Sequence, residues 1–320
     1  MKIKPCLAAI VPLFLAVAGC SAGAASDPSP GTSTPGTLRV VAGLYPLEYL
    51  ADAVGGDRVT VENLTVPGTE PHDLELTARQ VAAVAEADLV VFERTLQPAV
   101  DDAVDTAPAR RALDVTTIVP LVDRDTSVAA EETPGAEESE ADDHDHGDTD
   151  PHLWLDPTNM IDLAHGLADE LASIDPDGAT VYTANAETLA QRLNDLDAAF
   201  STGLATCQRR TFITSHAAFG YLADRYDLAQ ISISGLAPDA MPSPARIAEI
   251  TTLAHDEGLT TVFFETLTSP EVAETIARDA GLATDVLDPV EGITDQSHGS
   301  DYAEIMESNL TALRSANGCS

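Results

Sequence analysis

The amino-acid sequence predicts an α/β protein with two lobes, each a mostly parallel sheet flanked by helices, and one long helix that joins them. Short runs rich in β-branched residues alternate with amphipathic stretches in two separate parts of the chain, which is typical of parallel sheets with helical connections. Between these parts, residues 178–205 keep apolar side chains at helical spacing, with no internal glycine before Gly203. A helix of that length would extend about 40 Å. It therefore suits a rigid connection between two lobes.

The elements follow one another in a regular order. In the N-terminal lobe we expect strands at residues 38–44, 59–66, 88–92 and 112–117, with helices at 46–54, 78–86 and 97–106. Two helices follow, at 158–173 and 178–205. In the C-terminal lobe we expect strands at 211–214, 229–233, 260–264 and 284–287, with helices at 217–226, 244–257, 270–280 and 301–315. We therefore place the N-terminal lobe at 38–175, the linking helix at 176–206 and the C-terminal lobe at 207–320.

The first residues are predicted to be a targeting segment. Lys2 and Lys4 precede an apolar stretch at 7–16 and a small-residue site ending in Cys20, which together indicate a signal peptide at residues 1–19. The cysteine resembles a bacterial lipobox, so we expect cleavage before Cys20, a lipid on its thiol, and a flexible tether at residues 20–37. The alternatives are an ordinary secretion signal or a membrane helix, for which the apolar stretch is short. We expect an extracytoplasmic protein held to the outer face of the cell membrane by the lipid anchor only.

The net charge excludes some classes of binding partner, and the cysteine content indicates the redox state of the compartment. The formal net charge of −37 argues against nucleic acid and anionic substrates, because a negative field repels both. Once Cys6 is assigned to the signal and Cys20 to the lipid, Cys207 and Cys319 remain. In an oxidising compartment such a pair predicts a disulfide. A zinc-ligand role for either thiol is the alternative, but no CxxC spacing supports it.

A strip of alternating carboxylates and imidazoles lies in the middle of the chain. Residues 127–150 are acidic and poor in apolar side chains, which favours disorder. Within this strip, His144 and His146 either bind metal transiently or belong to a solubilising loop. The strip leads into Pro-His-Leu-Trp-Leu-Asp-Pro at 151–157, where the flanking residues stiffen the backbone around His152.

Three histidines stand where the ligands of one metal ion could meet. His72 and His216 each follow an expected strand and precede an expected helix, and the carboxyl ends of parallel strands are where α/β proteins hold ligands. His152 lies in the stiff segment just described. A single loop histidine is more often a hydrogen-bonding residue than a ligand, but the three together predict a metal site. His165 and His255 are expected at the surface or half-buried, without a ligand role. His298 could bind a metal, but the Ser-His-Gly loop that contains it is of a kind usually exposed to solvent.

The fourth ligand is expected to be a carboxylate or water. We favour Asp288, because it follows the carboxyl end of the last expected strand, just as His72 and His216 each follow the end of an expected strand. Asp301 and Glu265 are alternatives. Each carboxylate also has a structural interpretation: a turn before proline for Asp288, a helix N-cap for Asp301 and a strand-end salt bridge for Glu265.

These motifs resemble the metal-specific solute-binding lipoproteins of ABC transporters, the zinc/manganese uptake type (ZnuA-like, cluster A-I). The resemblance covers the mature chain and depends on the following segments: "GTEPHDLELT", "DPHLWLDP", "TSHAAFGYLADRYDL", "GLAPDAMPSPARIAEI", "FFETLTSPEVAETIARDAG", "VLDPVEG" and "SDYAEIMESNLTALR". It implies metal bound between two lobes by His72, His152 and His216, with Asp288 as the matching fourth position. It also implies that a histidine at position 216 favours zinc over manganese.

The expected function is high-affinity capture of Zn(II) outside the cytoplasm and its delivery to an ABC permease. A metallochaperone is a further candidate partner. The alternatives are a Mn(II)-binding member of the same family, a secreted zinc hydrolase with Glu265 as its base, or a zinc-binding adhesin. We do not expect an enzyme, because the sequence has no HExxH or similar signature.

Overall fold

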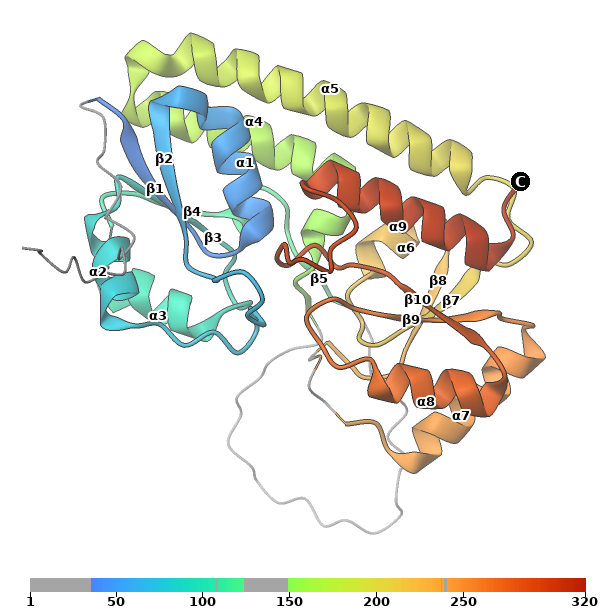
Figure 1. The fold of residues 1–320 in the computed structure, drawn as a ribbon. Coiled ribbons are helices and arrows are strands. Elements are labelled where there is room, and N and C mark those ends of the chain that lie inside the picture. Colours follow the sequence, from blue (N-terminus) through green and yellow to red (C-terminus); the bar gives the residue numbers. More distant parts are fainter. Residues whose placement is uncertain (1–35, 107–108, 124–148, 237, 239–240) are drawn as a thin grey trace, which may run out of the picture. The chain divides into compact units, whose positions relative to one another are not determined.

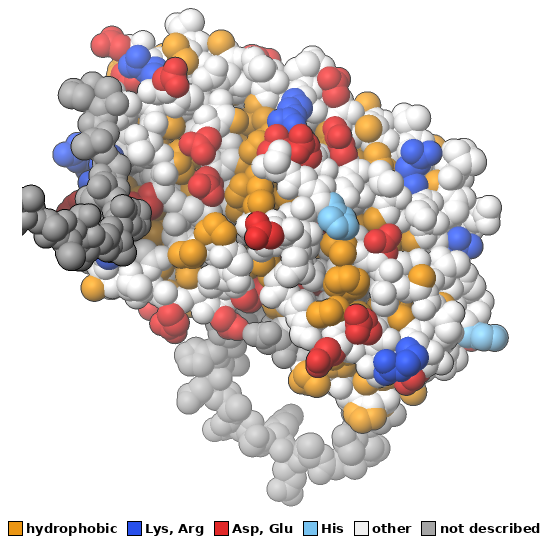
Figure 2. All heavy atoms as spheres, viewed as in Figure 1, with side chains coloured by type: hydrophobic (Ala, Val, Ile, Leu, Met, Phe, Trp, Pro, Cys, Tyr) orange, Lys and Arg blue, Asp and Glu red, His pale blue; other side chains and the backbone are white. Residues whose placement is uncertain are grey.

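The structure is a computed structural model, and it describes residues 36–106, 109–123, 149–236, 238 and 241–320. The expected signal peptide, Cys20, and the strip residues His144 and His146 lie outside the described residues. Within the described residues, no helix combines the length and the apolar character needed to cross a bilayer. Acidic side chains are scattered over the face drawn in Figure 2 rather than gathered in one patch.

The N-terminal half is built on a four-stranded parallel sheet in the order β2-β1-β3-β4 (Figure 1). Its strands are β1 (Leu38–Ala42), β2 (Val59–Asn63), β3 (Leu89–Phe92) and β4 (Ala112–Asp114), and its helices are α1 (Tyr45–Gly55), α2 (Ala78–Glu86) and α3 (Pro98–Thr106). All four residues of β3 are buried, as expected for a central strand covered on both faces. The α2 helix begins with a capping box in which Thr77 and Gln80 satisfy each other's backbone N–H groups.

The C-terminal half repeats this plan with a parallel sheet in the order β10-β9-β7-β8. Its strands are β7 (Thr211–Thr214), β8 (Ala229–Ser232), β9 (Thr261–Phe264) and β10 (Ala283–Val286), and its helices are α6 (Gly220–Arg225), α7 (Pro244–Asp256), α8 (Glu271–Ala280) and α9 (Tyr302–Asn317). The expected parallel α/β class is thus confirmed in both halves. The helix expected from residue 217 begins only at Gly220, because the Ala217 N–H donates to the Gly235 carbonyl instead of entering a helix.

Two helices connect the sheets. α4 (Pro157–Ile174) packs along α5 (Ala179–Gly203), and α5 also contacts α1 in the first half and α9 in the second. Figure 1 shows α5 running past both sheets on one side. One hydrophobic core cluster includes Leu47 of α1, Leu193 of α5 and Tyr302 of α9. The long helix expected at 178–205 is therefore present and shares a continuous core with both halves, while the exact lobe boundaries stay a prediction.

Two further features tie distant segments together. The segments on either side of residues 124–148 are paired as short antiparallel strands, β5 (Val122–Asp123) and β6 (Thr149–Asp150). The strip was expected to extend as far as residue 150, and this part of the expectation is wrong because Asp150 is fully buried in the pair with Val122. The expected disulfide between Cys207 and Cys319 is present and joins the end of the chain to the segment before β7.

Candidate metal centre

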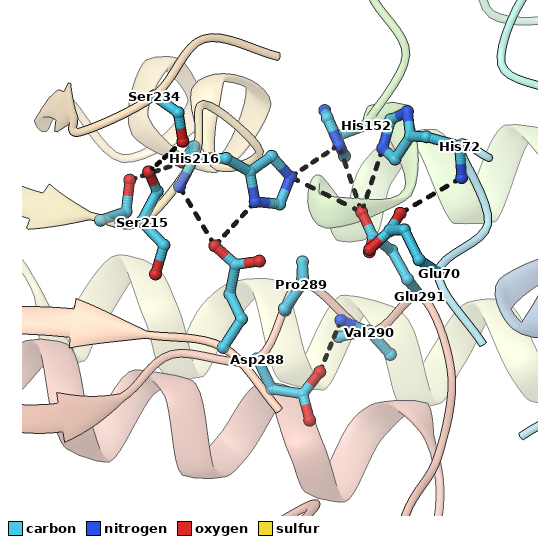
Figure 3. Close-up of polar contacts among 12 residues, drawn as sticks. Glu70, His72, His152, Ser215, His216, Ser234, Asp288, Pro289, Val290 and Glu291 are labelled. Carbon is cyan, nitrogen blue, oxygen red and sulfur yellow. Dashed lines mark hydrogen bonds and ion pairs between the residues drawn. The ribbon is translucent and has the colours of Figure 1, made fainter. Parts of the chain in front are cut away.

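Four side chains from both halves converge on one point. His72, His152, His216 and Glu291 each offer one ligand atom, and these four atoms lie within 4.8 Å of one another. The Oε1 atom of Glu291 lies 3.5 Å from Nε2 of His72, 3.3 Å from Nε2 of His152 and 3.7 Å from Nε2 of His216. Figure 3 shows the rings turned toward this carboxylate. Within the described residues it is the one such group of potential metal ligands.

The fold brings these residues together because the carboxyl edges of the two sheets face a common region. His72 follows β2, His216 follows β7 and Glu291 follows β10. His152 lies between β6 and a short 3-10 turn at Leu153–Leu155. The side chains of His152 and His216 are completely buried, and that of His72 is 16% exposed. The site is thus closed on the side of His152 and His216, and His72 lies nearest to solvent.

Two buried carboxylates orient two of the rings. The Oδ1 atom of Asp150 accepts the backbone N–H of His152 at 3.0 Å and lies 2.9 Å from its Nδ1. In the same way, Oε1 of Glu265 accepts the backbone N–H of His216 at 3.2 Å and lies 2.7 Å from its Nδ1. A carboxylate at Nδ1 favours the proton on that nitrogen and leaves Nε2 free to bind a metal. Both rings therefore present Nε2 toward Glu291.

His72 is held differently. The Oε1 atom of Glu70 accepts the backbone N–H of His72 at 3.2 Å, so this carboxylate fixes the loop rather than the ring. The Glu70 carboxyl lies close to that of Glu291 in Figure 3. Burial and then the negative charge of Glu291 raise the pKa of Glu70 to about 8.

Neighbouring charges shift the pKa values of the side chains at this point. Burial by itself lowers the pKa of His152, but Asp150 and Glu291 outweigh that effect, and the pKa is raised. For His216, burial opposes protonation in the same way, and Glu265 and Glu291 raise the pKa well above its usual range. Burial works to raise the pKa of Glu291, but the three histidines hold it well below the usual range. The directions of these pKa shifts favour an ionised Glu291 carboxylate next to protonated imidazoles, so the charges of the two groups stabilise each other.

The carboxylate beside the three histidines is that of Glu291, and the expected placement of Asp288 there needs correction. The Asp288 carboxylate accepts the Val290 N–H at 2.8 Å and the Thr266 hydroxyl at 3.2 Å, on the side away from the rings (Figure 3). These bonds form the turn that was the structural alternative for Asp288. The two alternative ligands also lie outside the group: Glu265 is the partner of the His216 Nδ1 atom, and Asp301 caps α9 and pairs with Arg192.

The other described histidines, His165, His255 and His298, lie outside the site. His298 and His255 are exposed, and the side chain of His255 is 90% accessible. His165 is half-buried on α4. None of the three belongs to the convergent group of described residues.

Sequence reasoning missed Glu291, Asp150 and the exact role of Glu265. Glu291 lies in the segment "VLDPVEG", three residues past Asp288. A glutamate that precedes a glycine in a loop after the last strand could have marked it as a candidate metal ligand. Asp150 precedes His152 by two residues, at the spacing that allows a side chain to accept the backbone N–H. The position of Glu265 next to Nδ1 of His216 is not visible from sequence, because the two residues are far apart in the chain.

The comparisons with known proteins point to one family. A family model described as ZnuA, the periplasmic component A of a zinc-uptake complex, matches residues 40–316. The zinc-binding lipoprotein AdcA of Streptococcus pneumoniae is 37% identical over 322 aligned positions, which cover 98% of this chain and 60% of that protein. The high-affinity zinc uptake system protein ZnuA of Bacillus subtilis is 32% identical, and 95% of each chain is covered. The chain thus spans about 60% of the length of the streptococcal relative and nearly all of the Bacillus relative.

Solved structures agree with this placement. The Zn(II)-bound ZnuA-like domain of Streptococcus pneumoniae AdcA is similar with a TM-score of 0.72 and 34% identity, covering 88% of this chain and 99% of that one. The laminin-binding protein Lmb of Streptococcus agalactiae, described as a bifunctional protein with adhesin and metal-transporting activity, is similar with a TM-score of 0.72 and 27% identity, covering 87% and 99%. With a family model that spans both sheets and all four convergent residues, the chain belongs to the ZnuA family of periplasmic zinc-uptake components.

Proposed function

We propose that this protein captures Zn²⁺ outside the cytoplasm and delivers it to an ABC permease for uptake. The proposed ligands are His72, His152, His216 and Glu291. The observation that carries the proposal is the convergence of three imidazole nitrogens and one carboxylate oxygen, from both halves of the fold, within 4.8 Å. Relatives named for zinc binding and zinc uptake support the same cargo.

The chemistry of this donor set favours zinc over manganese. Zn²⁺ is most often four-coordinate in proteins and binds imidazole and carboxylate, whereas Mn²⁺ prefers more oxygen ligands and a higher coordination number. Three imidazoles and one carboxylate complete a tetrahedral set without water. Cu²⁺ binds such ligands more tightly than Zn²⁺ in general, so metal supply contributes to selectivity in the cell.

Binding and release fit this site better than hydrolysis does. A zinc hydrolase keeps an open position for water and a free general base near it. Here Glu291 occupies the fourth ligand position, where a hydrolase would hold water. Glu265, the base expected for a hydrolase, already contacts the backbone N–H and the Nδ1 atom of His216. We do not propose an adhesive role like that of Lmb, because such a role would need a surface that binds a partner protein.

The proposed location and partners follow from the sequence and the family. A lipid on Cys20 would hold the protein at the outer face of the membrane, and the ABC permease would supply the direction and the energy of transport. We also propose, as from the sequence, a metallochaperone that loads the site with metal.

The proposal is tested by metal titration of the purified protein. Zn²⁺ is titrated in competition with a chromophoric chelator, for the unaltered protein and for His72→Ala, His152→Ala and His216→Ala. Removing one of the four ligands should lower zinc affinity by at least about a hundredfold, the upper end of the range for residues that only orient a ligand, because the metal loses a directly bound nitrogen. His255→Ala, on the exposed side of α7, is the matched control and should bind like the unaltered protein. Tight binding by all three site variants would place the zinc site elsewhere.

A further inference from the structure

The loop that presents Glu291 contains a backbone conformation that its residue rarely adopts. Val290 has a φ of +60°, in the left-handed region. A β-branched residue is uncommon there, because its Cβ substituents crowd the backbone. Val290 is fully buried, immediately before the carboxylate that meets the three histidines. An outlier of this kind persists only where neighbouring contacts determine it.

One side chain makes the contact that closes this turn. The Oδ1 atom of Asp288 accepts the N–H of Val290 at 2.8 Å, and Oδ2 accepts the Thr266 hydroxyl at 3.2 Å. An aspartate that accepts the N–H two residues later folds the chain into an Asx turn. Figure 3 shows Asp288 below the loop and Glu291 above it, turned toward the rings. The side chain of Asp288 thus controls the direction in which the chain leaves toward Glu291.

The backbone on the other side of the turn is held independently of that side chain. Asn309 of α9 accepts the N–H of Asp288 at 2.9 Å and donates to its carbonyl at 2.7 Å. The indole N–H of Trp154 donates to the Pro289 carbonyl at 2.7 Å. Trp154 lies two residues after His152, so the segment carrying one ligand holds the loop carrying another. Removing the Asp288 carboxylate leaves these bonds in place and frees the chain only from Val290 onward.

We infer that Asp288 is a positioning residue for the metal site: its carboxylate holds Val290 in the left-handed conformation and thereby directs Glu291 at the three histidines. The inference rests on the proposed zinc function. Asp288 does not contact the cation, and its effect on binding passes through Glu291 alone. Without the turn, Val290 relaxes to an extended or right-handed conformation, and the Glu291 carboxylate leaves the centre.

The test is a double-mutant cycle on zinc affinity. Asp288→Ala, Glu291→Gln and the double variant are titrated with Zn²⁺ against a chromophoric chelator, together with Asp288→Asn. Asp285→Ala, an aspartate on the exposed face of β10, is the matched control. Asp288→Ala is expected to bind zinc about ten to a hundredfold more weakly, the usual range for residues that orient a ligand. Glu291→Gln should bind at least as weakly, because it alters the ligand itself. The double variant should bind no more weakly than Glu291→Gln, because Asp288 has nothing left to position.

The amide variant separates positioning from ligation. An asparagine oxygen can accept the Val290 N–H, and its amide can donate to the Thr266 hydroxyl, so Asp288→Asn should restore zinc affinity to within about threefold of the unaltered protein. If Asp288 were itself a ligand, the amide would weaken binding as much as alanine does. The visible spectrum of the Co²⁺-loaded protein gives a second readout, since Asp288→Ala should reproduce the spectrum of Glu291→Gln. A general loss of stability would not produce that match.

The outcomes distinguish this inference from the function on which it rests. If the unaltered protein and Glu291→Gln behave as proposed but Asp288→Ala binds zinc normally, the positioning role is refuted and the zinc site stands. Additive losses in the double variant refute it as well. If Asp288→Ala does not fold, a tenfold or larger loss of affinity in Asp288→Asn overturns the inference by itself. Failure of the unaltered protein to bind zinc removes the proposed function and this inference together.

Discussion

At the scale of single residues, the three histidines differ in how firmly they are held. His152 and His216 each have one carboxylate that contacts both the backbone N–H and the ring Nδ1. His72 has a carboxylate on its backbone only, and its side chain is the one partly open to solvent. Two rings are therefore preorganised for a cation, and the third is the most accessible to solvent.

Zinc affinity should fall as the pH is lowered. The pKa values of His152 and His216 are raised in the protein without metal, so Zn²⁺ must displace protons from these rings to bind. Below those raised values each displaced proton lowers the apparent affinity about tenfold per pH unit. Competition titrations at about pH 8 and about pH 6 should therefore differ by more than tenfold, with weaker binding at the lower pH. Equal affinity at both values would show that the rings carry no protons in the free protein.

At the scale of elements, the beginning of α9 connects the ligand loop with the linking helix. Asp301 accepts the N–H of Glu304 at 3.0 Å as the N-cap of α9. It also pairs with Arg192 of α5, with nitrogen–oxygen distances of 2.9 and 3.1 Å. Both groups of this ion pair are partly exposed, at 46% for Arg192 and 29% for Asp301. The ion pair thus helps to orient α9 against α5 but contributes little to the free energy of unfolding.

Replacing Asp301 should affect stability slightly and zinc binding not at all. Asparagine is as good an N-cap as aspartate, so Asp301→Asn keeps the cap and removes only the ion pair with Arg192. We expect the free energy of unfolding to fall by less than about 1 kcal/mol, because exposed ion pairs contribute little. Urea unfolding measures this change, and chelator competition measures zinc affinity. A loss of affinity as large as that of His216→Ala would restore Asp301 as a ligand.

At the scale of the whole described molecule, one core is shared by the two halves, and one covalent bond closes the C-terminal half. The largest core cluster runs through α1, α4, α5 and α9 without interruption. The Cys207–Cys319 disulfide closes a loop with a sequence separation of 112 residues, from the segment before β7 to the end of the chain. The shared core favours little movement between the halves when metal binds, and the disulfide stabilises the C-terminal half.

Removing the disulfide should lower stability without removing the zinc site. Cross-linking a long loop restricts the unfolded chain, and losing such a bond typically costs about 2–5 kcal/mol. Cys207→Ser with Cys319→Ser is therefore expected to unfold at a lower urea concentration than the oxidised protein. Zinc affinity of the folded variant should be unchanged, because neither cysteine belongs to the group of four convergent ligands. Two free thiols in the unaltered protein by mass analysis would contradict the bond.

The sequence by itself determined the alternation of strands and helices, the long helix and the three histidines. These features depend on local patterns: β-branched runs, helical spacing of apolar residues, and histidines placed where strands give way to loops. The helix at 78–86 has the bounds expected from sequence, since a Thr77–Gln80 capping box fixes where it begins. A capping box or a periodic pattern of apolar residues is formed by residues close together in the chain, so it can be read from the sequence.

Only the tertiary structure decided which carboxylate meets the histidines and how the rings are oriented. The sequence favoured Asp288 and did not point to Glu291. Contacts from Asn309 and Trp154 fix the loop, and the turn at Val290 directs Glu291 inward. Asp150 was assigned to a disordered strip, yet pairing with Val122 buries it behind His152. A side chain's direction after a strand depends on partners far away in the chain, and no local pattern carries that information.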